Sequence, residues 1–101
     1  MEIAYAPQAI RDIEEILAST RMRSPSGATT LLHAIERAVE FCAEYPRTGC
    51  RTNRTDTFRR ALGKYRYTIF YRIVRGDLEI EILRVVRSSR VRNLEKVPDT
   101  D

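Results

Sequence analysis

The sequence predicts an α+β fold of two layers, in which an antiparallel helical hairpin packs on a small, mainly antiparallel sheet. Apolar residues recur at helical spacing through the first half of the chain, and after residue 56 the period changes to two. A short alternating segment precedes the helices, so the predicted order is β-α-α-β-β-β. With 101 residues the chain can bury one modest core. We therefore expect residues 1–101 to form one domain, with a loose tail from about residue 90.

Residues 2–6 alternate and predict the first strand. Pro7 suits the first position of a helix, where its missing N–H needs no partner, and this helix is expected to end near residue 19 or 20. Its predicted apolar stripe includes Ile10, and its polar face carries the charged residues Arg11, Asp12, Glu14 and Glu15. After a short connection over 21–24, Ser24-Pro25 repeats the start signal. The second helix must end before Pro46, because the residue preceding a proline is disfavoured in the α region.

Three further strands follow the loop over residues 46–56, and they are predicted at 57–62, 65–74 and 78–86. Gly76-Asp77 favours a two-residue hairpin turn between the last two. In the strand predicted at 65–74, every second residue from Tyr65 to Ile73 is apolar or aromatic, which predicts a face toward the core. The other parity is mixed, which indicates a central strand with one surface available for function.

The charge is distributed unevenly along the chain. Residues 1–50 carry five basic and seven acidic side chains, whereas residues 51–101 carry thirteen basic and seven acidic ones. Between residues 51 and 76 the only acidic side chain is Asp56, against eight basic ones. This asymmetry favours an anionic partner for the C-terminal half. The alternative is a solvated basic surface that serves only solubility.

The remaining composition predicts a cytoplasmic protein without a metal or cofactor. No apolar run approaches the roughly 20 residues of a membrane helix, and the N-terminus lacks the features of a signal peptide. Cys42 and Cys50 form neither a disulfide framework nor a metal site. Cys42 is expected to be buried and reduced, and a bridge to Cys50, although allowed by spacing, is not expected in a reducing compartment. His33, the single histidine, is expected on the wet face of the second helix.

Ordered along nearly the whole chain, these features resemble the RelE/ParE superfamily of bacterial type II toxins, and they are most similar to its ParE branch. No single motif is specific, but the set is. It comprises the Ala6-Pro7 helix start, Tyr45-Pro46 followed by Gly49, Phe58-Arg59-Arg60, the segment 65–72 (YRYTIFYR) and the segment 80–86 (IEILRVV).

The resemblance implies a toxin silenced by a small antitoxin, which is ParD-like or similar. ParE-type proteins are associated with poisoning of DNA gyrase, and RelE-type proteins with cleavage of mRNA in the ribosome. Of the RelE-type catalytic set, Arg66 matches the third-strand arginine and Arg59 stands at one lysine position. The second lysine of the set is replaced by Ala61, the C-terminal arginine by Ser88 and the tyrosine by Leu94. In many relatives a histidine follows the last strand, and here Arg87 takes its place. The incomplete set favours a gyrase poison over the alternative, an mRNA interferase. A third hypothesis is a relative that has lost toxicity and only binds its antitoxin.

The predicted target-binding residues are arginines, and no catalytic residue is predicted. They are Arg59, Arg66, Arg84, Arg87, Arg90 and Arg92. Arg84 has a second interpretation, because it shares the parity of Ile80 and Ile82 and could instead pair with a carboxylate at the edge of the sheet. The same cations are expected to receive an acidic segment of the antitoxin, while apolar anchors meet the exposed side of the helical hairpin.

Overall fold

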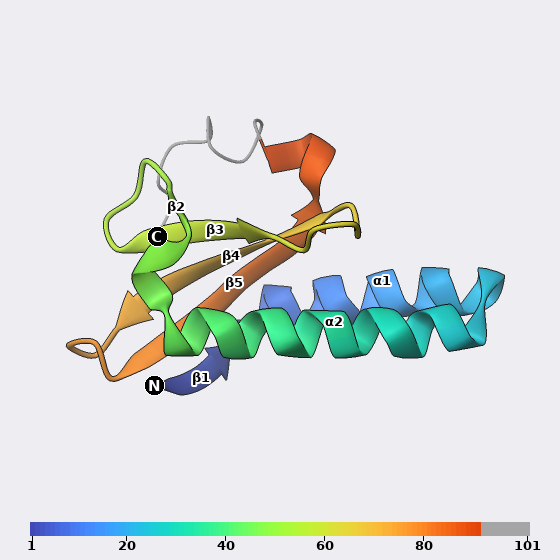
Figure 1. Cartoon of the computed structure of the whole chain (residues 1–101), viewed down its shortest axis with the longest axis horizontal. Helices are drawn as coiled ribbons and strands as arrows, with labels where there is room; N and C mark the ends of the chain where they lie inside the picture. The colour runs from blue at the N-terminus through green and yellow to red at the C-terminus, as the bar shows by residue number, and fades with distance from the viewer. Residues whose placement is uncertain (92–101) are drawn as a thin grey trace.

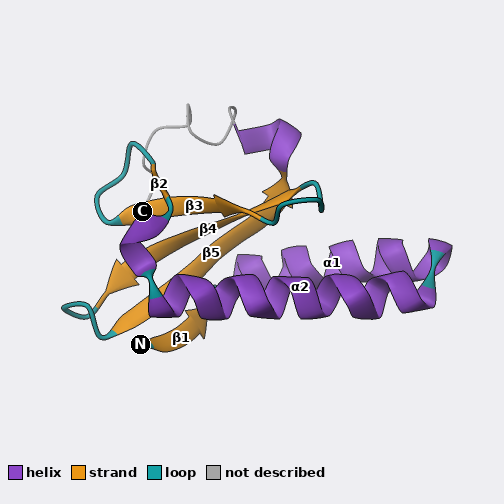
Figure 2. Ribbon diagram, in the orientation of Figure 1, coloured by secondary structure: helices purple, strands orange, loops and turns teal. Residues whose placement is uncertain are grey.

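The computed structural model describes residues 1–91 and has two layers (Figure 1). In chain order its elements are β1 (Glu2–Tyr5), α1 (Pro7–Arg23), α2 (Pro25–Glu44), the 3₁₀ turn η1 (Pro46–Thr48), β2 (Cys50–Arg51), β3 (Thr57–Ala61), β4 (Tyr67–Val74), β5 (Glu79–Arg87) and the 3₁₀ turn η2 (Ser88–Arg90). The two helices lie side by side against one face of the sheet (Figure 2). This arrangement confirms the predicted α+β fold.

The sheet has five strands in the order β1-β5-β4-β3-β2, and β1 pairs with β5 in parallel while the other pairs are antiparallel. The main core lies between the sheet and the helices and includes Ile35, Phe58, Tyr71 and Ile80. A smaller cluster of Phe70, Val86 and Val91, with Leu83 packed against it, covers the other side of β4 and β5. Both faces of the central strands are therefore partly buried.

The helices begin at the predicted prolines, but α1 continues to Arg23, past the predicted end near residue 20. The segment before Ser24 contains no helix-breaking residue, so the helix ends only where Pro25 forces Ser24 into an extended conformation, with φ −161° and ψ 104°. The Ser24 side chain accepts a hydrogen bond from the Gly27 N–H and caps α2. The prediction that Ile10 belongs to the core face is wrong, because its side chain is 46% exposed and Ala9 is buried instead.

A β-bulge in β5 changes which residues face the helices. Tyr71 pairs with Ile82, but the preceding Phe70 pairs with Arg84, so Leu83 is the extra residue. Before the bulge Ile82 contributes to the main core, and after it Val85 does. Strict alternation from Ile80 therefore does not predict the inward residues at the end of this strand.

Strand boundaries differ from the predicted ones by one or two residues, and one strand was missed. β2 lies within the segment predicted as a loop, where Cys50 and Arg51 pair with β3. β4 begins at Tyr67, two residues later than predicted. Gly76 and Asp77 have positive φ angles of 62° and 70°, as the predicted turn requires, but Arg75 also has a positive φ of 56°. The connection between β4 and β5 is therefore the four residues 75–78 and not two.

The two cysteines lie on opposite sides of the sheet. Cys42 is fully buried in the main core, as predicted, and Cys50 is exposed on β2. Cys50 pairs with Arg59, and Arg59 pairs with Phe70 on the side away from the helices. Paired residues of neighbouring strands project to the same face, so the sheet separates the two thiols.

Gly49 is needed where the chain leaves α2 and enters the sheet. A Cβ atom on Gly49 would lie 2.5 Å from the Tyr71 hydroxyl and 2.9 Å from the Arg59 carbonyl oxygen. The Tyr71 hydroxyl donates a hydrogen bond of 2.7 Å to the Pro46 carbonyl and so ties this corner to the middle of β4. The spacing of Pro46 and Gly49 in the sequence thus has a packing reason.

We expect Tyr71 to ionise only at very high pH, because its burial and, to a lesser degree, the neighbouring Cys42 raise its pKa to about 12. An unfolded tyrosine loses its proton near pH 10, so the unfolded state gains stability first. The contribution of Tyr71 to the free energy of unfolding should be constant below about pH 10 and fall between about pH 10 and 12. Denaturant unfolding of wild type and Tyr71→Phe between about pH 10 and 12 measures this contribution. If the free energy of unfolding falls equally steeply with pH in both proteins, the buried phenol of Tyr71 does not cause the loss of stability.

Candidate target-binding surface

Three of the predicted arginines gather at one end of the sheet, where β4 begins and β5 ends. Arg66 immediately precedes β4, and Arg87 pairs with Tyr67 at the end of β5. The Ser88 N–H donates a 2.9 Å hydrogen bond to the Arg66 carbonyl, which fixes the start of η2 beside Arg66. Arg90 follows in η2, and all three side chains are exposed.

Within residues 1–91 these three guanidinium groups have no carboxylate at ion-pair distance. The opposite end of the sheet differs, since Arg47 contacts Asp77 at 2.9 Å and Arg75 contacts Glu79 at 3.2 Å. The partner of Arg87 is instead the ring of Tyr67, whose centroid lies 5.8 Å from the guanidinium carbon. Among residues 1–91, the uneven charge of the sequence therefore becomes a group of three arginines without ion-pair partners at one end of the sheet.

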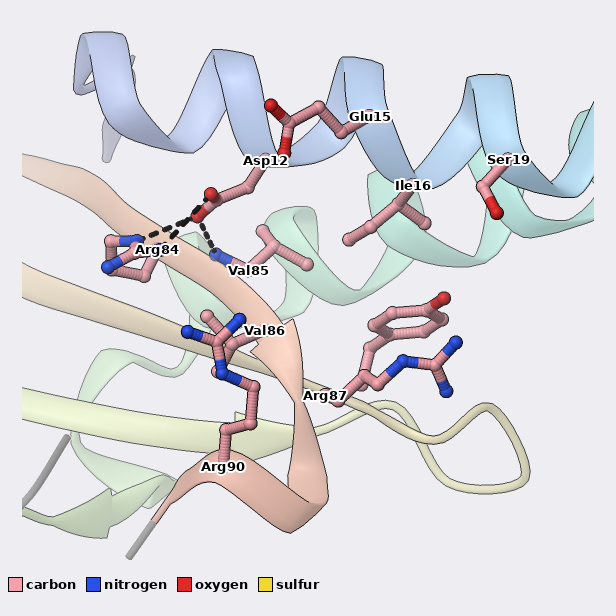
Figure 3. A pocket seen from close by; sticks show the side chains of 10 residues that line it. Asp12, Glu15, Ile16, Ser19, Arg84, Val85, Val86, Arg87 and Arg90 are labelled. Atoms are coloured by element: carbon pink, nitrogen blue, oxygen red, sulfur yellow. Dashed lines mark hydrogen bonds and ion pairs between the residues drawn. The ribbon is translucent and has the colours of Figure 1, made fainter. Parts of the chain in front are cut away.

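Two cavities lie at this end and share Arg87. The larger, with a volume of about 310 Å³, is lined by Gly63, Tyr65, Arg66, Arg87, Ser88 and Ser89. The smaller, of about 210 Å³, lies between α1 and the end of β5, and Figure 3 shows the Arg90 side chain extending from η2 toward β5 at its margin. Arginine side chains thus line both hollows.

Arg84 takes the second of its two interpretations, because its side chain pairs with Asp12. Its Nε donates to one carboxylate oxygen at 2.8 Å and its Nη2 to the other at 3.2 Å (Figure 3). The carboxylate also accepts the Val85 N–H at 3.0 Å and the Gln8 amide at 3.0 Å. Burial raises the pKa of Asp12, but the hydrogen bonds from Arg84, Gln8 and Val85 outweigh it and hold the pKa below its ordinary value.

Asp12 corrects a prediction, since it is only 7% exposed and does not lie on the polar face of α1. The reason lies in the sheet, where β1 ends at Tyr5 while β5 continues to Arg87. Beyond that point the edge of β5 would leave a buried N–H without a strand partner, and the Asp12 carboxylate supplies the acceptor instead. Nothing in the helical periodicity indicates this contact, because it depends on where a strand from the other end of the chain lies.

The other predicted positions are not in this group. Arg59 lies on β3 between Cys50 and Phe70 of the neighbouring strands, is half-buried and has an interaction partner. Arg92 lies outside the described residues. The sequence did not indicate that the ring of Tyr67 contacts Arg87. The only available signal was the position of Tyr67 in the alternating aromatic segment 65–72. The sequence also did not indicate the contact of Arg60, whose guanidinium carbon lies 4.6 Å from the ring centroid of Phe41.

The larger cavity is suited to holding an anion and offers little for proton transfer. No histidine, lysine or carboxylate is among the described residues that line it, and His33 is an exposed residue of α2. An arginine stays protonated near neutral pH, so it can neutralise a phosphate but shuttles protons poorly. In the part of the chain that the structure describes, no three His, Cys, Asp or Glu residues are grouped to hold a metal ion. Neither α1 nor α2 is long and apolar enough to cross a membrane.

Solved structures share this fold. The chromosomal ParDE toxin–antitoxin system from P. aeruginosa is similar at a TM-score of 0.72 and 21% identity, covering 86% of this chain and 95% of that one. The E. coli RelBE complex has a TM-score of 0.62 at 11% identity, covering 85% and 94%. The isolated E. coli RelE toxin has 0.61 at 12%, covering 92% and 97%.

No curated protein matches the sequence. A family match, by contrast, extends over residues 3–92, and that family is described as the ParE toxin of the type II toxin–antitoxin system parDE. Since the match spans most of the chain, this protein belongs to the ParE toxin family of type II toxin–antitoxin systems.

Proposed function

We propose that this protein is a toxin that inhibits growth by binding DNA gyrase, and that a cognate antitoxin neutralises it in the cytoplasm. Residues 1–101 act as one toxin domain. The observation that carries the proposal is the group of arginines Arg66, Arg87 and Arg90 around cavities at one end of the sheet, none of which has a carboxylate partner within residues 1–91. Such a surface is complementary to an anionic partner and does not depend on a proton donor or acceptor.

The positions compared with the RelE-type nuclease support binding over cleavage. Ala61 provides no cation at the end of β3, and the hydroxyl of Ser88 is held 2.8 Å from the hydroxyl of Thr68. RNA cleavage requires a group that activates the 2′-hydroxyl and another that protonates the leaving oxygen. Arg66 alone could stabilise charge but could fill neither role.

The antitoxin is proposed to combine an acidic segment with apolar anchors. Exposed apolar side chains are available on the helical hairpin, among them Ile10 on α1, Phe41 on α2 and Tyr45 directly after α2, which are 46%, 45% and 48% exposed. The ParDE and RelBE structures are described as toxin–antitoxin systems, which supports a partner of the same kind. Burial of the apolar anchors supplies affinity, and the arginines accelerate encounter with the acidic segment.

Induced expression tests this function in cells. Wild type without an antitoxin should arrest colony growth and reduce negative supercoiling of a reporter plasmid, and co-expression of the antitoxin from the neighbouring reading frame should restore both. A variant in which Arg66, Arg87 and Arg90 are glutamine should permit growth, whereas a matched triple variant of the exposed Arg11, Arg23 and Arg37 should remain toxic. Normal growth with abundant folded wild type would instead support a relative that has lost toxicity.

An mRNA interferase is the second candidate, because Arg66, which matches the third-strand arginine of RelE-type proteins, lines a cavity of about 310 Å³. This function requires that wild type cut a message in a translating extract and that Arg66→Ala abolish the cut. An mRNA that stays intact in the presence of wild type that is toxic in cells excludes the interferase function. Plasmid supercoiling measured in the same extract tests inhibition of gyrase.

A further inference from the structure

The larger cavity at the end of the sheet has the donors that a phosphate group requires. We propose that it binds one phosphodiester of a nucleic-acid backbone, so that the toxin itself contacts the nucleic acid. The inference deepens the proposed function and rests on it for its biological setting. Its test uses only the purified chain and an oligonucleotide, so that a negative result there leaves gyrase inhibition to be judged separately.

The sheet fixes the backbone of both arginines that line the cavity. Arg87 is fixed by its pairing with Tyr67, and Arg66 by the hydrogen bond that its carbonyl accepts from the Ser88 N–H. Both side chains line the cavity, and within residues 1–91 neither has a carboxylate partner. Arginine presents several N–H donors in a planar fork that matches the oxygens of a phosphate. Two such forks on one hollow favour a bound anion over empty solvent.

Hydroxyl groups complete the donor set. Ser89 lines the cavity, and its hydroxyl has no hydrogen-bond partner among the described residues. Ser88 also lines the cavity, and its hydroxyl contacts that of Thr68, which can leave the Ser88 proton directed to a ligand. Phosphate oxygens accept hydrogen bonds from both arginine and hydroxyl donors in nucleic-acid complexes.

An aromatic wall favours a nucleotide over an acidic side chain. Tyr65 lines the same cavity, and Lys64 extends its Nζ to 5.4 Å from the Tyr65 ring centroid. A nucleotide can place its base or sugar against the ring while its phosphate contacts the arginines. A glutamate of an acidic peptide has no ring to stack there. Tyr65 also packs against the main core, so only the part of its ring that lines the cavity is available to a nucleotide. The volume of about 310 Å³ accommodates more than a carboxylate.

Fluorescence anisotropy with the full-length protein tests the proposal. The probes are labelled single-stranded DNA of about 12 nucleotides and RNA of the same sequence, which distinguish the two sources of the phosphodiester. The variants are Arg66→Gln and Arg87→Gln, and the matched control is Arg37→Gln, which removes the same charge from an exposed position on α2. Arg66→Lys keeps the charge without the fork, and circular dichroism checks that every variant is folded.

We expect Arg66→Gln and Arg87→Gln each to weaken binding of at least one probe by about three- to tenfold and to reduce the salt slope by about 0.7. Arg37→Gln should bind like wild type, and Arg66→Lys should recover part of the affinity. An equal loss in Arg37→Gln would mean only general attraction to a basic protein and would overturn the proposal. Displacement of the probe by a glutamate peptide as effectively as by unlabelled oligonucleotide would also overturn it, because the cavity would then be a carboxylate site.

Discussion

Replacing Asp12 with alanine is expected to lower the free energy of unfolding by about 3 kcal/mol, which is the low end of the range for breaking a buried ion pair. The change leaves both Arg84 and the Val85 N–H without their acceptor. The low end applies because the Arg84 side chain is 32% exposed and can recover part of its hydration. Urea unfolding measures the difference. Glu14→Ala, an exposed carboxylate on the same helix, is the control and should change stability by less than about 0.5 kcal/mol.

The pH dependence separates the charge of Asp12 from its packing. Because its pKa is lowered in the folded state, its stabilising contribution is complete above the unfolded pKa of about 3.9 and is lost as pH falls through the folded value. Asp12→Asn should therefore flatten the loss of stability below about pH 4. An Asp12→Asn protein that loses stability in acid as steeply as wild type would show that other carboxyl groups are responsible.

Replacing Gly49 with alanine is expected to cost about 2–3 kcal/mol, a typical value for forcing an extra methyl group into a filled site. The new Cβ would approach the Tyr71 hydroxyl and the Arg59 carbonyl at 2.5 and 2.9 Å, so the hydroxyl must leave its hydrogen bond to Pro46. Backbone strain is not the cause, since the φ of Gly49 is −72°. Thermal and urea unfolding of the variant measure the loss.

A double-mutant cycle tests this mechanism. Tyr71→Phe should cost about 1 kcal/mol by itself, because the Pro46 carbonyl loses its donor. Combined with Gly49→Ala it should cost clearly less than the sum, because the hydroxyl that the new methyl group displaces is already absent. Strict additivity would show that the contact with the Arg59 carbonyl, and not the hydroxyl, is the critical one.

The sequence was sufficient for the architecture because local signals agree with the fold. Pro7, Ser24-Pro25 and Pro46 mark helix ends whatever the tertiary context, and the change of period marks the start of the sheet. The ends of helices and strands were less predictable. For example, α1 continues to Arg23 because no helix-breaking residue precedes Pro25.

The site was only partly predictable, because its decisive contacts join distant parts of the chain. The sequence predicts target binding for Arg66, Arg87 and Arg90 from their positive charge. The structure brings all three together where β4 begins and β5 ends. The Asp12–Arg84 pair spans 72 residues and lies next to a bulge in β5 that no local sequence pattern predicts. The burial of Asp12 on α1 and the position of Arg84 among apolar residues of β5 are explained only when the two side chains are seen to pair.

Gyrase assays on the purified protein test the central claim most directly. Wild type is incubated with purified gyrase and relaxed plasmid, with the triple glutamine variant of Arg66, Arg87 and Arg90 as the matched control. We predict that wild type inhibits supercoiling and that cleaved gyrase–DNA complexes accumulate, while the triple variant does neither. Unchanged supercoiling and no cleaved complexes at a saturating concentration of folded wild type would contradict the proposed action on gyrase.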